Sequence, residues 1–279
     1  PMPINDTYVV PAPVVNFLCE HERSFLALRL VHGLLYVLDT ALRGKMALVP
    51  AHFSKQHSVR TSTLAAAVGP EKATDNRWVH AACLELADQN ILKNPTVQGR
   101  VFRFELGKKF SATFSMPTTA FAVMRTDQIR QCRTLHDLIF LSLTCLHGGK
   151  DRPRFLLPRI PMRLKPESSP SSLLPQEPPV QDPWRVPWCK SSRSWVNAAI
   201  RTSQILDHGY LIAPRQDMID DFVSEVAVKI QTTKTTWERG KLYKFPPGTR
   251  SVVQIPIAGS KTTLNAETLQ YKWHQTVIQ

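Results

Sequence analysis

The stretch that decides the fold spans residues 61–109 and reads TSTLAAAVGPEKATDNRWVHAACLELADQNILKNPTVQGRVFRFELGKK. Three hydroxyl residues, Thr61 to Thr63, precede the apolar run Leu64 to Val68, and Gly69-Pro70 follows it. Hydroxyl side chains cap the start of a helix, and a Gly-Pro pair does not continue one. The pattern therefore predicts a short helix followed by a turn.

A longer second helix follows the turn, with Asp75 and Asn76 as candidate caps, and it extends to about Asn90. Its inward side is predicted by apolar residues at helical spacing, which are Trp78, Val79, Ala82, Cys83 and Leu86. The opposite side carries Arg77, His80, Ala81 and Leu84, and the acidic Glu85 and Asp88 come nearer the end of the helix. A helix with a positive start and small residues behind it can enter a DNA major groove. We therefore expect Arg77 and His80 to contact bases.

An antiparallel ribbon is predicted after this helix. Val97 and the alternating run Val101 to Leu106 flank Gln98-Gly99, which is a suitable tight turn. The candidate DNA-backbone contacts around this ribbon, or wing, are Arg60, Lys72, Arg100, Arg103, Lys108 and Lys109. The alternative is an ordinary helix pair with a hairpin and solvated charges, because short motifs of this kind have no invariant chemistry.

The residues before this stretch supply its support. Residues 1–15 contain four prolines and are predicted to form an extended arm. A long helix is predicted over residues 16–43, a first strand over 45–49, and a polar connection over 50–60.

The bulk properties favour a folded chain with a polyanionic partner. The 279 residues are 43% hydrophobic, which is enough for two domains with their own cores. Lys and Arg number 35 against 22 Asp and Glu, giving a net charge of +13 and a pI near 9.8. The basic excess is spread along the chain, which favours a long contact surface over a charged tail.

The cysteines and apolar runs bear on the compartment. Five cysteines without a CxxC pair fit a reducing cytosol, and the apolar runs are too short or too charged to span a bilayer. The opening residues lack the basic start and apolar run of a signal peptide. We therefore expect a cytoplasmic, nucleoid-associated protein that does not contact a membrane.

The second half begins with a helical pattern over Arg125 to His147 and continues into a proline-rich stretch, residues 150–190. The segment Arg77 to Ala82 is then echoed by Ser194 to Ala199. Asp88 to Leu92 is echoed by Asp207 to Leu211 if two residues are inserted. Duplication and chance both remain open.

A duplication would imply a second reading helix over 193–208 and a second wing over 237–256. The corresponding candidate DNA contacts are Arg193, Asn197, Arg201, Arg239, Lys241, Lys244 and Arg250. Residues 214–224 are predicted to form a helix, and residues 225–230 to continue it or to switch to a strand. Asp217, Asp221 and Glu225, at spacings of four, form an acidic line that is expected to face away from DNA.

Over residues 16–115 this arrangement resembles winged helix-turn-helix DNA-binding proteins. With the echo around Trp195, the whole chain resembles the tandem winged-helix initiators of plasmid replication, although the proline-rich stretch departs from them. The resemblance implies a mainly α fold with small β-hairpins (α+β), made of two winged-helix-like domains. The expected segments are an arm (1–15), the first domain (16–115), a helix of the second domain (116–149), the connector (150–190), the second domain (191–260) and a C-terminal segment (261–279).

The expected function is sequence-specific binding of double-stranded DNA, as a replication initiator on repeated origin sites, with self-association or replication and transcription proteins as further partners. No cofactor, metal or catalytic residue is expected, because the sequence has no phosphate-binding loop and no nucleophile elbow. Three alternatives stay open. They are a transcriptional regulator with the same contacts, a metal-dependent nuclease that uses the acidic line, and a protein-recruiting scaffold.

Overall fold

The computed structural model describes residues 6–20, 23–42, 55–70, 76–151, 153–159, 162–163, 180–181, 188–216, 223–232, 251–257 and 274–277. It divides the chain into two compact units. The first contains residues 1–153 and 204–206, and the second contains residues 154–203 and 207–279. Each unit mixes helices with strands, in agreement with the expected α+β class. Within the described residues, no helix is long and apolar enough to cross a membrane.

The first unit opens with a strand and two helices. These are β1 (Thr7–Pro11), α1 (Ala12–Glu20) and α2 (Phe25–Ala41). β1 pairs antiparallel with β5 (Phe121–Arg125), so the predicted arm forms a sheet strand and the start of a helix. The predicted helix over 16–43 is two helices, because Ser24 has an extended backbone and caps α2. Its hydroxyl accepts a hydrogen bond from the Ala27 N–H at 3.1 Å.

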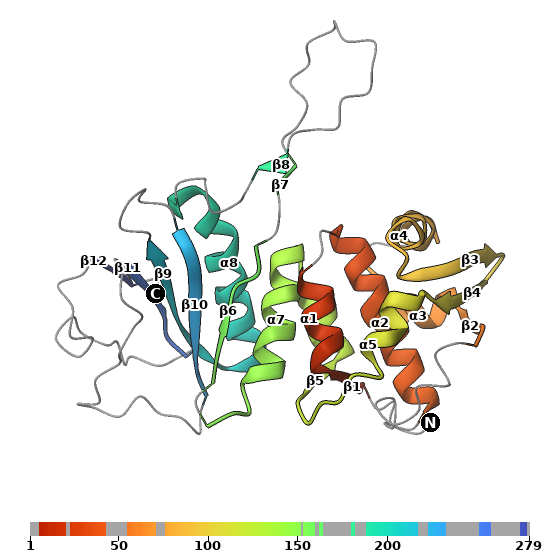
Figure 1. The fold of residues 1–279 in the computed structure, drawn as a ribbon, viewed down its shortest axis with the longest axis horizontal. Helices are drawn as coiled ribbons and strands as arrows, with labels where there is room; N and C mark the ends of the chain where they lie inside the picture. Colours follow the sequence, from red (N-terminus) through yellow and green to blue (C-terminus); the bar gives the residue numbers. More distant parts are fainter. Residues whose placement is uncertain are drawn as a thin grey trace, which may run out of the picture. The chain divides into compact units, whose positions relative to one another are not determined.

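α2 is the central helix of this unit, and most of its side chains are buried. Gly33 lets the next helix approach closely, because a Cβ at this position would lie 2.6 Å from Val68 Cγ2. In Figure 1, α2 lies beside α3 and α4.

The expected order of helix, strand, helix, helix and ribbon is present after α1. It comprises α2, β2 (His57–Arg60), α3 (Thr61–Val68), α4 (Arg77–Asp88), β3 (Leu92–Gln98) and β4 (Val101–Leu106). The strands form one antiparallel sheet in the order β2-β4-β3. The first strand of this sheet is predicted at residues 45–49, which lie outside the described residues. The first strand in the structure is β2, which pairs with β4 and lies inside the segment 50–60 that was expected to be a connection.

Residues 107–149 belong to the first unit. They form α5 (Lys108–Thr113), β5, α6 (Thr126–Gln131) and α7 (Leu135–His147). Residues 116–149 are predicted from the sequence to belong to a second domain, but β5 completes the sheet of β1, and the buried face of α7 packs on β5 and α1.

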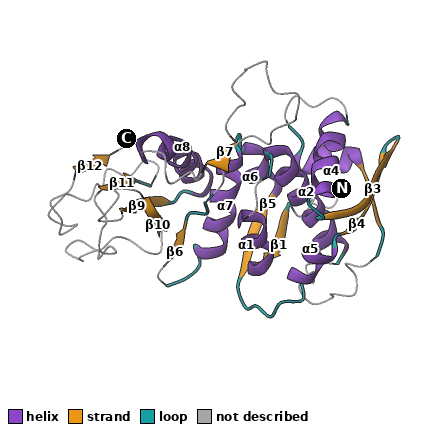
Figure 2. Ribbon diagram, turned by 45° about the horizontal axis from the view of Figure 1, so that its top comes forward, coloured by secondary structure: helices purple, strands orange, loops and turns teal. Residues whose placement is uncertain are grey.

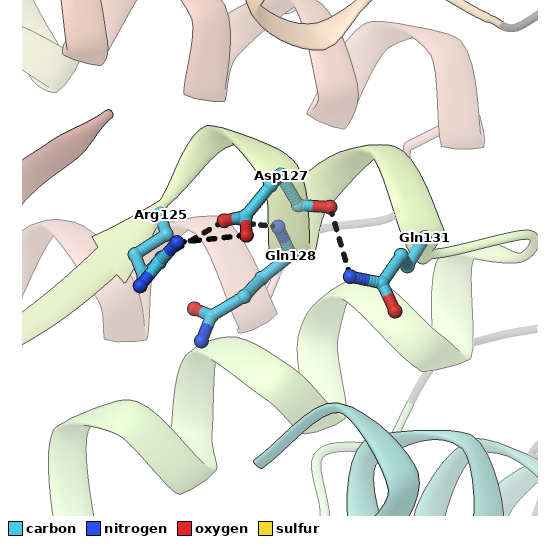
Figure 3. Close-up of polar contacts among 4 residues, drawn as sticks. All are labelled: Arg125, Asp127, Gln128 and Gln131. Atoms are coloured by element: carbon cyan, nitrogen blue, oxygen red, sulfur yellow. Dashed lines mark hydrogen bonds and ion pairs between the residues drawn. The ribbon is translucent and has the colours of Figure 1, made fainter. Parts of the chain in front are cut away.

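The predicted continuous helix over Arg125 to His147 is a strand end and two helices. At the start of α6, Arg125 donates to both carboxylate oxygens of Asp127, at 3.0 and 2.9 Å, while Gln131 Nε2 donates to the Asp127 carbonyl at 3.3 Å (Figure 3). Thr134 then caps α7, since it exchanges side-chain and backbone hydrogen bonds with Asp137. Apolar periodicity continues across this break, so the sequence pattern predicts a single helix there.

The second unit is built around a long helix and a five-stranded sheet. The helix is α8 (Trp188–Leu206), of which residues 188–203 belong to this unit. The strands are β6 (Arg154–Leu156), β9 (Gly209–Gln216), β10 (Val223–Gln231), β11 (Ser251–Ile255) and β12 (His274–Val277), in the order β12-β11-β9-β10-β6. Two short strands, β7 (Met162–Arg163) and β8 (Val180–Gln181), form a separate pair. Figure 2 shows the strands in orange.

This unit contains more sheet than the small hairpins that were expected. Pro214 was interpreted as a helix start, yet it lies in β9 opposite Val226 of β10. Glu225 is also on a strand and lies 3.5 Å from Arg215, so it is not part of an acidic helix line. Asp217 and Asp221 lie outside the described residues, as does most of the predicted hairpin over 237–256. The connector over 150–190 contributes β6 to the sheet.

Candidate nucleic-acid interface

The two faces of α4 differ as predicted from the sequence. Its inward residues are buried, namely Trp78, Val79, Ala82, Cys83 and Leu86. Its outward residues are exposed, namely Arg77, His80, Ala81, Leu84 and Asp88. Glu85 is turned toward the fold, where its carboxylate accepts a hydrogen bond from the Ser24 N–H at 2.6 Å. The first three turns of the exposed face therefore carry basic and apolar side chains without a carboxylate.

The turn between β3 and β4 is tied to the starts of both α3 and α4. Asn76 Nδ2 donates to the Gly99 carbonyl at 3.3 Å, and the Thr61 N–H donates to the Arg100 carbonyl at 2.9 Å. Gly99 has a φ of 59°, which a glycine adopts without strain. The turn is thus held in place by one residue immediately before α4 and by the first residue of α3.

These bonds bring three exposed arginines into one neighbourhood of the first unit. Arg60 directly precedes α3 and pairs with Val101, Arg77 is the first residue of α4, and Arg100 is in the turn. Figure 1 shows the β3–β4 ribbon beside α4. Three guanidinium groups on neighbouring backbone segments produce a positive surface that favours phosphate.

The outer face of the β2-β4-β3 sheet continues this positive surface. Arg103 lies opposite Ser58 and Thr96, and its Nη1 donates to Gln98 Oε1 at 2.6 Å. An amide orients a guanidinium without cancelling its charge. Lys93, by contrast, forms an ion pair with Glu105 at 2.9 Å. The positive character of the ribbon is therefore concentrated toward the turn.

Lys108 and Lys109 do not belong to this surface. They are exposed, but they begin α5, whereas they were expected to line the ribbon. The chain leaves the sheet at Gly107, whose N–H donates to the Ile91 carbonyl at 2.7 Å. A Cβ at Gly107 would lie 1.8 Å from the Asn90 carbonyl oxygen, so the close contact of the two strands there requires glycine. Both lysines are consequently at the end of the ribbon opposite the Gly99 turn.

Asn76 has a different role from the one predicted for it. The sequence suggests a helix cap, but the Asn76 side chain forms no capping hydrogen bond with α4, and its amide reaches the ribbon turn instead. The other predicted cap, Asp75, lies outside the described residues. No local sequence signal indicates this contact, because its partner is 23 residues away in the chain. The candidate Lys72 lies outside the described residues.

In the second unit, the middle of α8 also has a buried face and an exposed face. Trp195, Val196, Ala198 and Ala199 are buried, whereas Arg193 and Asn197 are exposed and Arg201 is partly exposed. The remaining candidates of the second wing, Arg239, Lys241, Lys244 and Arg250, lie outside the described residues.

The sequence echo has a structural counterpart in the two units. Asn90 after α4 and Asp207 after α8 both have a positive φ, 55° and 54°, and each precedes the first strand of an antiparallel hairpin. The spacing from Trp78 to Asn90 equals the spacing from Trp195 to Asp207. The two segments therefore align without the two-residue insertion that sequence matching introduced.

A buried polar network supports α2 behind the interface. Tyr8 Oη lies 2.9 Å from His32 Nδ1, and Ser142 Oγ lies 3.4 Å from His32 Nε2, so β1, α2 and α7 meet at this imidazole. Burial lowers the pKa of His32 from 6.5 to about 3. The imidazole is therefore neutral at physiological pH and has a structural role.

In the described part of the chain, no three His, Cys, Asp or Glu side chains lie together in a group that could hold a metal ion. Cys19, Cys83, Cys132 and Cys145 form no disulfide there.

Comparisons with known proteins show a likeness in fold and none in sequence. No protein-family model matches the chain, and no curated protein is similar to it in sequence. Among solved structures, the chain is similar to the Pi initiator protein, which was crystallised in complex with iteron DNA. The TM-score is 0.55 at 10% sequence identity, and the match covers 83% of this chain and 100% of that chain. The chain therefore has a fold similar to that of an initiator protein.

Proposed function

We propose that this chain is a non-enzymatic winged helix-turn-helix protein that binds double-stranded DNA at specific sequences and initiates replication at repeated sites. α4 is the reading helix and enters the major groove, where Arg77 and His80 contact base edges. The ribbon of β3 and β4 is the wing. Arg100 and Arg103 on the wing, with Arg60 beside it, contact the sugar-phosphate backbone.

The observation that carries this proposal is the joining of the ribbon turn to the starts of α3 and α4 through Thr61 and Asn76. A reading helix needs a fixed angle to the backbone contacts that position it, because phosphate contacts set the register in which base contacts are made. The two bonds supply that fixed relation, and they place Arg60, Arg77 and Arg100 around it.

The initiator role is supported by the likeness in fold. The Pi initiator was crystallised with iteron DNA, and its whole chain is matched here. The helix and hairpin that recur in both units support a tandem arrangement, in which α8 is a second reading helix with Arg193, Asn197 and Arg201 on its DNA side.

The test is selection of bound fragments from a random pool of DNA duplexes with the full chain. We expect an enriched sequence, bound at least about a thousandfold more tightly than an unrelated duplex at physiological salt. Recovery of unenriched fragments, or no recovery at all, contradicts specific DNA binding. Enriched sites that occur as repeats at an origin support initiation, whereas single sites at promoters contradict it and indicate a regulator of transcription.

The absence of enzymatic activity is tested separately. Supercoiled plasmid incubated with the chain and Mg²⁺ should remain uncut. Cleavage that is lost in Asp221→Ala would contradict the proposal and identify a metal-dependent nuclease.

A further inference from the structure

Leu84 is the most exposed large apolar side chain among the described residues, with 69% of its surface accessible. Met116, Val123 and Leu156 are also exposed, at 52, 57 and 56%. Single exposed apolar residues are common on protein surfaces and need no explanation by themselves. The position of Leu84 on α4 distinguishes it from the other three.

Leu84 lies on the same face of α4 as the two residues proposed to contact bases. His80 is four residues before it and Arg77 is seven residues before it, which are helical spacings for a single face. Ala81, three residues before it, is also exposed. The short Ala81 side chain leaves room for another surface to reach Leu84.

The folding of α4 does not require leucine at this position. The helix is anchored by Trp78, Val79 and Leu86, which are buried at 7, 0 and 0% exposure. An apolar side chain held in water contributes little to stability, and it becomes favourable when a partner surface removes it from water.

We propose that Leu84 reads the C5-methyl group of thymine in the major groove, an inference that rests on the proposed function. In the major groove the thymine methyl is the one apolar group that distinguishes a base-pair edge, and apolar side chains recognise it. Arg77 and His80 supply the polar contacts from the first turn of the helix, and Leu84 supplies the apolar contact one turn later.

Charge favours DNA over a protein as the partner of this face. The exposed cations Arg60 and Arg100 adjoin the start of α4, and Glu85 is turned toward Ser24. The exposed carboxylate of this face is Asp88, at the last position of the helix, one turn beyond Leu84. A face that is basic at its start and apolar at Leu84 matches a groove between two phosphate strands better than it matches an apolar protein patch.

The test is a cycle of protein and DNA substitutions on the duplex enriched by selection. Each thymine is replaced singly by deoxyuridine, which removes only the methyl group, and affinity is measured for the native chain and for Leu84→Ala. At one thymine, or at two neighbouring thymines, we expect the native chain to lose about fourfold in affinity per methyl removed. Leu84→Ala should bind the thymine and deoxyuridine duplexes about equally there.

The matched control is Leu156→Ala, which removes an exposed leucine from β6 in the other unit. It should keep the native response to every deoxyuridine. The inference is overturned if no thymine of the enriched duplex gives a loss of affinity that depends on Leu84 when it is replaced by deoxyuridine. The proposed function is still supported in that case, because the enrichment itself tests it. It is also overturned, in favour of a protein contact, if Leu84→Ala changes the sedimentation of the free chain and leaves the thymine response intact. Failure to enrich any duplex contradicts the proposed function as well.

Discussion

Burial of His32 makes the stability of the first unit sensitive to pH at the level of a single residue. The folded pKa is lowered to about 3, below the unfolded value of 6.5, so the unfolded chain binds the proton more readily. The stabilising contribution is fully present above pH 6.5 and is lost as the pH falls toward 3. Between these pH values, protonation of His32 lowers the free energy of unfolding by up to about 1.4 kcal/mol per pH unit.

We predict that His32→Gln reduces the decrease in unfolding free energy between about pH 7 and pH 5, measured by urea unfolding at several pH values. The matched control is His80→Gln, which removes an exposed imidazole and should retain the native pH dependence. Equal pH dependence in His32→Gln and in the native chain would contradict the assignment of this buried, neutral imidazole.

The contact between Asn76 and the ribbon turn leads to a prediction at the level of elements. Asn76→Ala removes the hydrogen bond to the Gly99 carbonyl while leaving both α4 and the ribbon intact. A hydrogen bond of this kind is worth about 1 kcal/mol, so we expect DNA affinity to fall by up to about fivefold. The unfolding midpoint should change little, because the bond is exposed to solvent.

Gln131→Ala provides the matched control for that change. It also removes an exposed bond from a side-chain amide to a backbone carbonyl, here that of Asp127, away from the proposed interface. Its DNA affinity should equal that of the native chain. If Asn76→Ala and Gln131→Ala bind DNA equally well, the ribbon turn and α4 are not coupled.

The elements that were predictable from the sequence are those whose signal is local. The two faces of α4 and the turn at Gly99 follow from helical periodicity and from a residue suited to a positive φ. The starts of α2 at Ser24 and of α7 at Thr134 are not predicted from the sequence. Apolar residues continue on both sides of each position, and the signal for the start is a single capping hydroxyl.

Pairing between distant strands was the least predictable feature. β2 and the strand through Pro214 are defined by partners far along the chain, and their own residues resemble a polar connection and a helix start. The candidate site was likewise predicted in part. Its arginines are recognisable by charge, but the contacts of Asn76 and Thr61 that position them join segments distant in the sequence.

At the level of the whole molecule, the recurrence of helix, positive-φ residue and hairpin predicts that each unit reads its own part of the DNA site. We expect selections repeated with Arg77→Ala and with Asn197→Ala to relax sequence preference at different positions of the enriched duplex. Loss of preference at the same positions in both variants would contradict two separate reading helices. A selection with Arg133→Ala, which changes an exposed arginine outside both helices, serves as the control.

The central claim is that α4 reads bases while the adjacent ribbon holds the DNA backbone. Its most direct test is a titration of the enriched and an unrelated duplex over a range of salt concentrations with Arg77→Ala and Arg100→Ala. Arg77→Ala should weaken binding to the enriched duplex at least about tenfold and to the unrelated duplex only slightly. Arg100→Ala should weaken both equally and reduce the salt slope by about one. The claim would be contradicted if DNA affinity did not depend on salt concentration. It would also be contradicted if Arg77→Ala and the native chain had the same ratio of affinities for the enriched and the unrelated duplex.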